Sequence, residues 1–172
     1  RRYGWQVEAG WNTVTPGVVP ALALAVRALS APGEAVIIEE PVYYPFREVV
    51  EDNGRSVAAV PLVRDADGVY RRDLAALEAT IEETGSRLLL LCNPHNPVGR
   101  VWSRDELAAL DEVASRHGVV IVADEIHADL ALPGFATTPF ASLGEATAAR
   151  TITCTSPSKS FNLAGLQVAN IL

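Results

Sequence analysis

Methionine is absent from this 172-residue chain and lysine nearly so, because all but one of its 14 basic residues are arginine. The exception is Lys159, and so rare a residue type draws attention to it as a candidate for chemistry. Without methionine the sequence contains no start codon, and its last residues fall within an apolar stretch that has no turn signal. We therefore expect a segment of a longer protein.

Positive charge is also scarce, since 21 acidic residues against 14 basic ones give a net charge of −7. This balance argues against a nucleic-acid groove and a polybasic membrane surface. Long apolar runs are missing too: the runs 88–92 and 119–123 are far shorter than the roughly 20 residues that span a bilayer. The amino end lacks the apolar segment of a signal peptide. We expect a cytoplasmic protein with a small-molecule substrate, and no nucleic-acid or membrane partner.

Cysteine and histidine are too few and too scattered for a disulfide scaffold or a metal centre. The two cysteines, Cys92 and Cys154, show no C-x-x-C spacing, and we interpret them as buried, reduced thiols. The histidines form no ligand cluster, so no metal ion is expected. With 49% hydrophobic and 20% charged residues, the composition is that of a folded domain and excludes disordered, collagen-like and coiled-coil chains.

What the sequence does contain is an alternation of strands and helices. Apolar runs predict strands at 35–39, 56–62, 87–92, 119–123 and 150–155. Helical patterns lie at 17–29, 44–52, 73–84 and 104–117. The central strands are apolar throughout, which is typical of a parallel sheet covered on both faces. The fold class is therefore α/β, a three-layer α/β/α sandwich with a mostly parallel sheet.

Residues at the helix ends fix several of these boundaries. Ser103 and Glu106 form a capping box at the start of the last helix, and Gly118 is placed to end it. Thr15 is expected to cap the first helix, with Pro16 at the first helical position.

Polar segments follow three neighbouring predicted strands, at 93–99, 124–127 and 156–159. The last of these is expected to be a loop. In open α/β sheets, ligands bind beyond the carboxyl ends of the strands. The sequence therefore brings an amide, a carboxylate and the only lysine to one edge of the sheet.

The common nucleotide and hydrolase motifs are missing from this edge. No G-x-G-x-x-G, P-loop or G-x-S-x-G pattern occurs, so NAD, ATP and α/β-hydrolase chemistry lack their signatures. A lone lysine at a strand end suits a Schiff base. A pyridoxal 5'-phosphate (PLP) site needs such a lysine, an acid for the pyridine nitrogen, and a helix N-terminus with neutral donors for the phosphate.

The segments at 93–99 (NPHNPVG), 123–127 (ADEIH) and 156–159 (SPSK) resemble the motifs of fold-type I PLP enzymes, the aminotransferase class I/II superfamily. Within it the chain most resembles the aminotransferase-like C–S lyases, the cystathionine β-lyase branch. The features that favour this branch are 3–5 (YGW), 16–20 (PGVVP), 124–127 (DEIH) and 161–167 (FNLAGLQ).

The resemblance implies roles for the residues that would contact the cofactor ring. Lys159 would hold the cofactor as a Schiff base, and Asp124 would pair with the pyridinium nitrogen. Asn96 would donate a hydrogen bond to the ring 3'-oxygen. Tyr43 would stack on the ring, although the adjacent Tyr44 offers a second candidate.

Ser156 and the backbone amides of Gly17 and Val18 would hold the phosphate. His127 occupies the position of a tyrosine that contacts the 3'-oxygen in many aminotransferases. Gln167 stands where aminotransferases usually carry an arginine that binds the phosphate, and the lyase branch commonly has this glutamine.

The resemblance also implies an architecture and an activity. Residues 1–172 would form a single PLP-binding large domain, truncated at both ends, with an N-terminal arm and a C-terminal small domain missing. The family's sheet contains one antiparallel strand, and the segment is expected to end about where that strand begins. The active site would be completed across a homodimer. The implied reaction is β-elimination on a sulfur amino acid such as cystathionine, giving a thiol, pyruvate and ammonia. An aminotransferase and a non-catalytic, PLP-sensing regulatory domain remain as alternatives.

Overall fold

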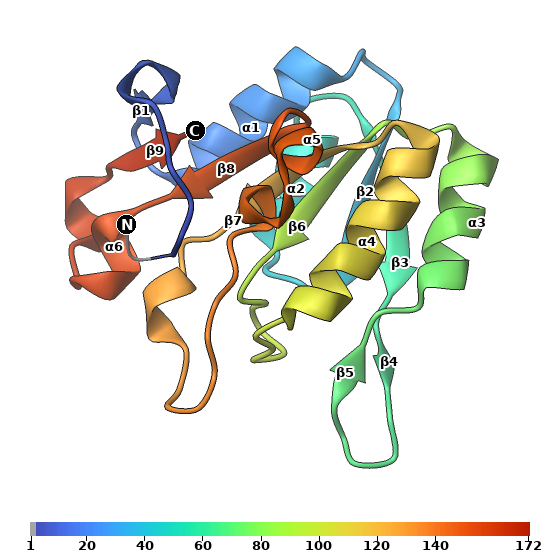
Figure 1. Ribbon diagram of the computed structural model, residues 1–172. Coiled ribbons are helices and arrows are strands. Elements are labelled where there is room, and N and C mark those ends of the chain that lie inside the picture. The colour runs from blue at the N-terminus through green and yellow to red at the C-terminus, as the bar shows by residue number, and fades with distance from the viewer. Residues whose placement is uncertain (1–2) are drawn as a thin grey trace.

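The structure, a computed structural model, describes residues 3–172. A mostly parallel sheet lies between two layers of helices (Figure 1), as the sequence predicts. Within the described residues the main sheet has seven strands in the order β1-β9-β8-β7-β6-β2-β3. These are β1 (Thr13–Thr15), β2 (Ala35–Glu40), β3 (Ser56–Pro61), β6 (Leu88–Cys92), β7 (Val120–Asp124), β8 (Thr151–Thr155) and β9 (Ala169–Ile171).

Strands β3, β2, β6, β7 and β8 pair in parallel in that order. Strand β9 runs antiparallel to both of its neighbours, β8 and β1. The family resemblance implies an antiparallel strand that begins about where the chain ends; β9 instead lies just inside the chain. A hairpin of β4 (Val63–Arg64) and β5 (Tyr70–Arg71) projects from the body of the protein (Figure 1).

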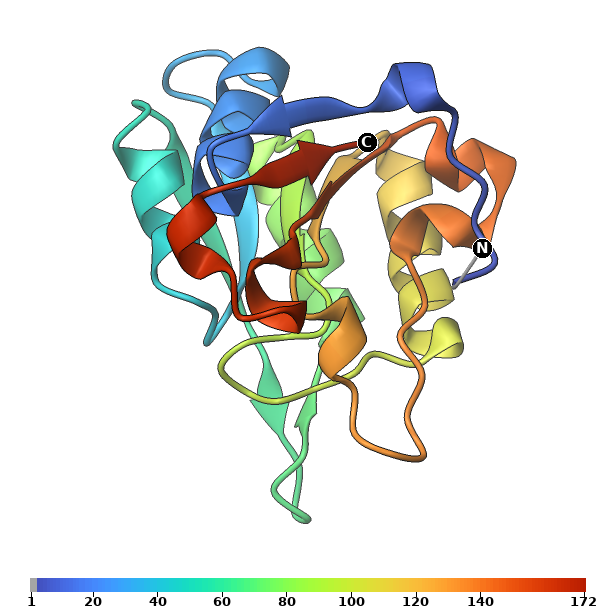
Figure 2. The ribbon, with the colours of Figure 1, turned by 90° about the vertical axis from the view of Figure 1, so that its left-hand side faces the viewer.

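The longer helices are α1 (Val18–Leu29), α2 (Pro45–Glu51), α3 (Leu74–Thr84) and α4 (Arg104–His117). Shorter elements are η1 (Ala9–Trp11), η2 (Ala128–Leu130), η3 (Phe140–Leu143), α5 (Glu145–Ala148), α6 (Pro157–Ser160) and η4 (Ala164–Leu166). Helices α3 and α4 lie on one face of the sheet and α1 and α2 on the other (Figures 1 and 2). Among the described residues, no helix is both long enough and apolar enough to cross a membrane.

Alternation along the strands divides the core into two clusters. In β7, Ile121 packs in the cluster of α3 and α4, whereas Val122 packs in that of α1 and α2. Successive side chains of a strand point to opposite faces, so Asp124 lies on the same face as Val122, toward α1. This places the carboxylate at the carboxyl end of β7, on the side where α1 begins.

Local hydrogen bonds confirm the predicted boundaries of α4. Ser103 accepts from the backbone of Glu106, the Glu106 side chain accepts from the backbone of Ser103, and Gly118 ends the helix with a φ of 64°. At this φ a Cβ is strained, which explains why glycine follows the helix.

The predicted start of α1 is wrong. Thr15 is the last residue of β1, where it pairs with Ala169, and Gly17 is the N-cap of a helix that begins at Val18. The sequence pattern showed a hydroxyl before a proline but not the pairing with β9, a strand more than 150 residues away. The segment 156–159, expected as a loop, contains most of α6 because Pro157 and the Ser156 side chain start a helical turn there.

Candidate active site

A cavity of about 530 Å³ lies at the carboxyl ends of β6 and β7, next to the start of α1. Most of the residues that the sequence marked as a site contribute to its wall. They are Gly17, Val18, Tyr43, Asn96, Asp124, His127 and Lys159. Segments from five different parts of the chain therefore meet in one place, as the position of strand ends predicts.

Asp124 is the most deeply buried charged group of this wall, with 5% of its surface exposed. Its Oδ1 accepts a hydrogen bond of 3.1 Å from the backbone N–H of Ile126. Burial raises the pKa of Asp124 to about 7, against the lowering effects of the Ile126 hydrogen bond and of the charge on Lys159. A buried carboxylate of this kind is stabilised by a cationic partner in the cavity.

Lys159 lines the cavity from α6. Ser158 beside it also lines the cavity. Ser156 does not, because its hydroxyl caps α6: it accepts from the Ser158 N–H at 3.0 Å and bonds the Val168 carbonyl at 2.7 Å. Sequence reasoning overlooked Ser158 as a wall residue, and its adjacency to Lys159 was the available signal.

The start of α1 presents backbone donors to the cavity. Gly17 has a φ of 120°, and no side chain caps the helix. The first turn carries no acidic residue. The N-terminal N–H groups of a helix, together with its dipole, form a binding site for an anion such as a phosphate. Gln167 lies on the same cavity wall, so an amide rather than a cation accompanies these donors.

Asn96 and Tyr43 come from the loops that follow β6 and β2. The Asn96 backbone N–H donates to Cys92 Sγ at 3.3 Å, which ties the loop to the strand end. Tyr43 lines the cavity and contacts Tyr44 edge to face, with ring centroids 5.1 Å apart. Tyr44 is 66% exposed and is not part of the cavity wall, so the geometry favours Tyr43 of the two.

Two histidines near the site differ in position. His127 is half-buried in the cavity wall, and burial and the charge of Lys159 lower its pKa. His95 is 2% exposed and its Nε2 lies 3.1 Å from the Pro41 carbonyl, so it links two loops rather than facing the cavity. Burial lowers the pKa of His95 to about 4, which keeps the ring neutral.

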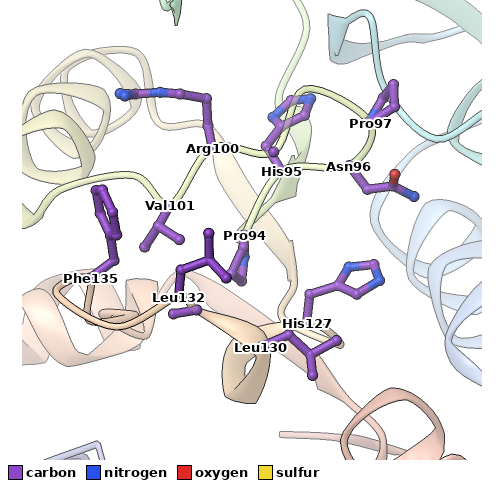
Figure 3. A pocket seen from close by; sticks show the side chains of 12 residues that line it. Pro94, His95, Asn96, Pro97, Arg100, Val101, His127, Leu130, Leu132 and Phe135 are labelled. Atoms are coloured by element: carbon purple, nitrogen blue, oxygen red, sulfur yellow. The ribbon is translucent and has the colours of Figure 1, made fainter.

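A second cavity of about 500 Å³ adjoins the first (Figure 3). Asn96 and His127 line both cavities. In Figure 3 their side chains extend away from Leu132 and Phe135, which belong to the second cavity alone. Asn96 and His127 therefore form a wall shared between the two cavities.

The acid that follows Asp124 lies on the other side of the sheet and was overlooked in the sequence. Glu125 is 4% exposed, and its Oε1 accepts from the backbone N–H of Phe140 at 2.8 Å. Burial raises the pKa of Glu125 to about 8. It joins the end of β7 to η3 and takes no part in the cavity wall.

The site can thus offer an amine, a carboxylate for a cationic nitrogen, an amide donor and a helix N-terminus for an anion. Residues 6–172 match the sequence profile of the aminotransferase class I and II family. The chain belongs to that family.

Members of the family with known names include both lyases and aminotransferases. Cystathionine β-lyase PatB of Bacillus subtilis is 48% identical over 99% of this chain and 44% of its own length. The PLP-containing crystal structure of cystalysin from Treponema denticola superposes with a TM-score of 0.96 at 42% identity, covering 99% of this chain and 43% of cystalysin.

A PLP-bound putative aminotransferase from Clostridium difficile 630 also superposes with a TM-score of 0.96, at 40% identity over 99% of this chain and 44% of that one. The chain therefore spans less than half the length of these relatives.

Proposed function

We propose that the protein containing this chain is a PLP-dependent C–S β-lyase that cleaves cystathionine or related cysteine derivatives to a thiol, pyruvate and ammonia. One observation carries the proposal: Lys159, Asp124, Asn96 and the start of α1 face a single cavity. The identity to cystathionine β-lyase PatB and the overlap with cystalysin favour the lyase reaction over others in the family.

The donor set of the cavity fits PLP. The start of α1 would bind the phosphate, with its exposed N–H groups and no acidic residue to repel the anion. Asp124, buried with a raised pKa, is suited to hold a proton on the pyridine nitrogen. Asn96 would donate to the 3'-oxygen, Tyr43 would pack on the ring, and Lys159 would supply the amine.

PLP, when bound, supplies a ring that withdraws electrons from the α-carbon of an attached amino acid. Lys159 would remove the α-proton as a general base. Asp124 would keep the ring nitrogen protonated throughout. The electron pair left at the α-carbon would form a double bond to the β-carbon as the bond between the β-carbon and sulfur breaks. Sulfur would leave as the thiol, and hydrolysis of the remaining unsaturated fragment would give pyruvate and ammonia.

We further propose that residues 1–172 form the PLP-binding large domain of a longer enzyme, which acts as a cytoplasmic homodimer on an amino-acid substrate. Two free, buried cysteines support a reducing compartment. Exposed apolar side chains beside the site, among them Phe161 and Leu166, support a surface covered in the assembled enzyme.

The reaction is tested by giving the complete gene product cystathionine as its only substrate. A lyase accumulates pyruvate and free thiol over many turnovers without an added keto acid, because PLP is regenerated in each cycle. Turnover that stops after about one equivalent and resumes with a keto acid would instead identify an aminotransferase, the second candidate that the C. difficile structure favours. PLP binding without any turnover would favour a regulatory domain.

A further inference from the structure

Asp129 connects α6, which carries Lys159, to the segment that follows Asp124. It lies in η2, shortly after the turn that holds Asp124 and His127. Its Oδ2 accepts a hydrogen bond of 2.6 Å from the Ser160 hydroxyl, and its Oδ1 accepts one from the Tyr3 hydroxyl. Ser160 directly follows Lys159.

The short helix α6 needs such an attachment. It consists of Pro157–Ser160, a single turn with no buried residue. One helical turn does not hold its shape by its own hydrogen bonds, because ordering the backbone costs more than one bond returns. The Ser156 side chain fixes the beginning of the turn and Asp129 its end. Lys159 stands between these two points.

The element that carries Asp129, η2, is itself attached to neighbouring segments. The buried hydroxyl of Thr137 donates to the Ala128 carbonyl at 2.9 Å, which holds η2 beside its neighbouring loop. The turn between Asp124 and Asp129 contains a further hydrogen bond of 3.0 Å, from the Ala128 N–H to the Glu125 carbonyl. A bond from Ser160 to Asp129 therefore connects the lysine helix to the same turn that positions Asp124.

We propose that Asp129 is a positioning residue which, through Ser160, sets the location of the Lys159 amine relative to Asp124. The inference rests on the proposed function, which gives Lys159 a cofactor to bind. If the bond to Ser160 is lost, α6 moves relative to the turn, and the amine no longer meets the group that Asp124 holds at the required distance. A misplacement of about 1 Å costs a reaction between oriented groups up to roughly 10²-fold in rate.

A carboxylate suits this role because each of its oxygens accepts from a different segment. Hydrogen bonds to an ionised acceptor are about twice as strong as neutral ones. Asparagine would keep one accepting oxygen and turn its amide donor toward the second hydroxyl. Asp129→Ala and Ser160→Ala each remove the attachment, whereas Ser160→Thr keeps the hydroxyl.

The test follows PLP added to the PLP-free form of the complete gene product. The dependence of the rate on PLP concentration separates the affinity for PLP from the first-order step in which the lysine amine forms the visible PLP–lysine chromophore. We expect Asp129→Ala and Ser160→Ala each to slow the first-order step on the order of tenfold. The double variant should be no slower than either single one, because both remove the same bond.

Matched controls separate positioning from a general loss of structure. Ser160→Thr should retain the wild-type rate, and Tyr3→Phe should stay near it, since it leaves the Ser160 bond in place. In a Lys159→Ala background, Asp129→Ala should not change the affinity for non-covalent PLP, which reports an intact cavity.

A first-order rate of Asp129→Ala within twofold of wild type overturns the inference, and so does a slow Asp129→Ala beside a fast Ser160→Ala. A reduced affinity in the Lys159→Ala background also overturns it, because the effect is then structural. If the wild-type protein forms no chromophore, the proposed function fails and takes this inference with it; a normal wild-type chromophore confines any failure to Asp129.

Discussion

Burial sets the chemistry of individual residues around the cavity. Asp124 and Glu125 follow each other in sequence, yet one faces the cavity and the other the opposite side of the sheet. Burial raises the pKa of both. The sequence indicated Asp124 because it ends a strand, but it offered no sign that Glu125 would be equally buried and tied to η3.

Asp124→Asn tests the role of the first acid. An amide keeps the size of the side chain but carries no negative charge to hold a proton on a cationic nitrogen. We expect the variant of the complete gene product to bind PLP while kcat falls on the order of 10²-fold. PLP binding is measured by absorbance and kcat by pyruvate release.

Asp105→Asn provides the matched control, because Asp105 is an exposed acid at the start of α4. It should leave kcat unchanged. A kcat of Asp124→Asn within a few-fold of wild type would show that Asp124 has only a structural role.

Among the elements, α1 departs most from its sequence prediction. Gly17, not Thr15, is its cap, with a φ of 120° and a ψ of 165° that essentially only glycine adopts. A Cβ at Gly17 would meet Pro20 Cδ at an ordinary contact distance of 3.6 Å, so the requirement for glycine comes from the backbone conformation and not from lack of space. The start of the helix therefore depends on a glycine that brings its N–H groups to the cavity.

Gly17→Ala should weaken PLP binding on the order of tenfold, because the strained residue shifts the donors at the helix start. The affinity is measured by titrating the PLP-free protein. Gly33→Ala is the matched control: Gly33 also has a positive φ, of 86°, but is not part of the cavity wall. Both variants should lose thermal stability. Equal PLP affinity in the two would refute the role of the α1 start.

At the scale of the whole molecule, buried polar groups connect the layers. The Arg72 guanidinium pairs with the buried Glu39 and lies over the Trp102 ring, with its central carbon 4.4 Å from the ring centroid. Trp102 donates through Nε1 to the Cys92 carbonyl at 3.2 Å. The end of β6, from which the Asn96 loop departs, is thereby held from the side of α4.

Glu125 links stability to pH across this structure. Its folded-state pKa, about 8, lies above that of an exposed glutamate, so the folded protein holds a proton that the unfolded chain releases. The stabilisation is complete below about pH 4.5 and is lost as pH rises through 8. We expect Glu125→Gln, which is neutral at every pH, to flatten this loss.

Thermal unfolding of both proteins between pH 5 and pH 9 measures the effect. Relative to wild type, the Tm of Glu125→Gln should rise with pH by at least about 2–4 °C, the equivalent of about 1 kcal/mol. Glu82→Gln, a change at an exposed glutamate, should follow the wild-type curve. A constant difference in Tm across this range would contradict the buried, proton-holding Glu125.

The sequence by itself determined the parallel sheet, its covering helices and the edge at which the site lies. Strands such as β6 and β7 are apolar throughout because both of their faces are buried, and this pattern is local. The capping box at Ser103 could also be predicted, because it depends only on nearby residues. Lys159 could be singled out from composition alone, because it is the only lysine.

Tertiary structure alone decided what depends on distant partners. Strand β1 is three residues long and largely exposed, so it exists only through its pairing with β9. Because Thr15 takes part in this pairing, α1 is capped by Gly17 and not by Thr15 as the sequence predicted. The packing of the loops decides which of Tyr43 and Tyr44 faces the cavity, and it also brings Asp129 to Ser160. Such contacts produce no periodic pattern in the sequence, because they join residues that are far apart along the chain and do not depend on the residues next to either partner.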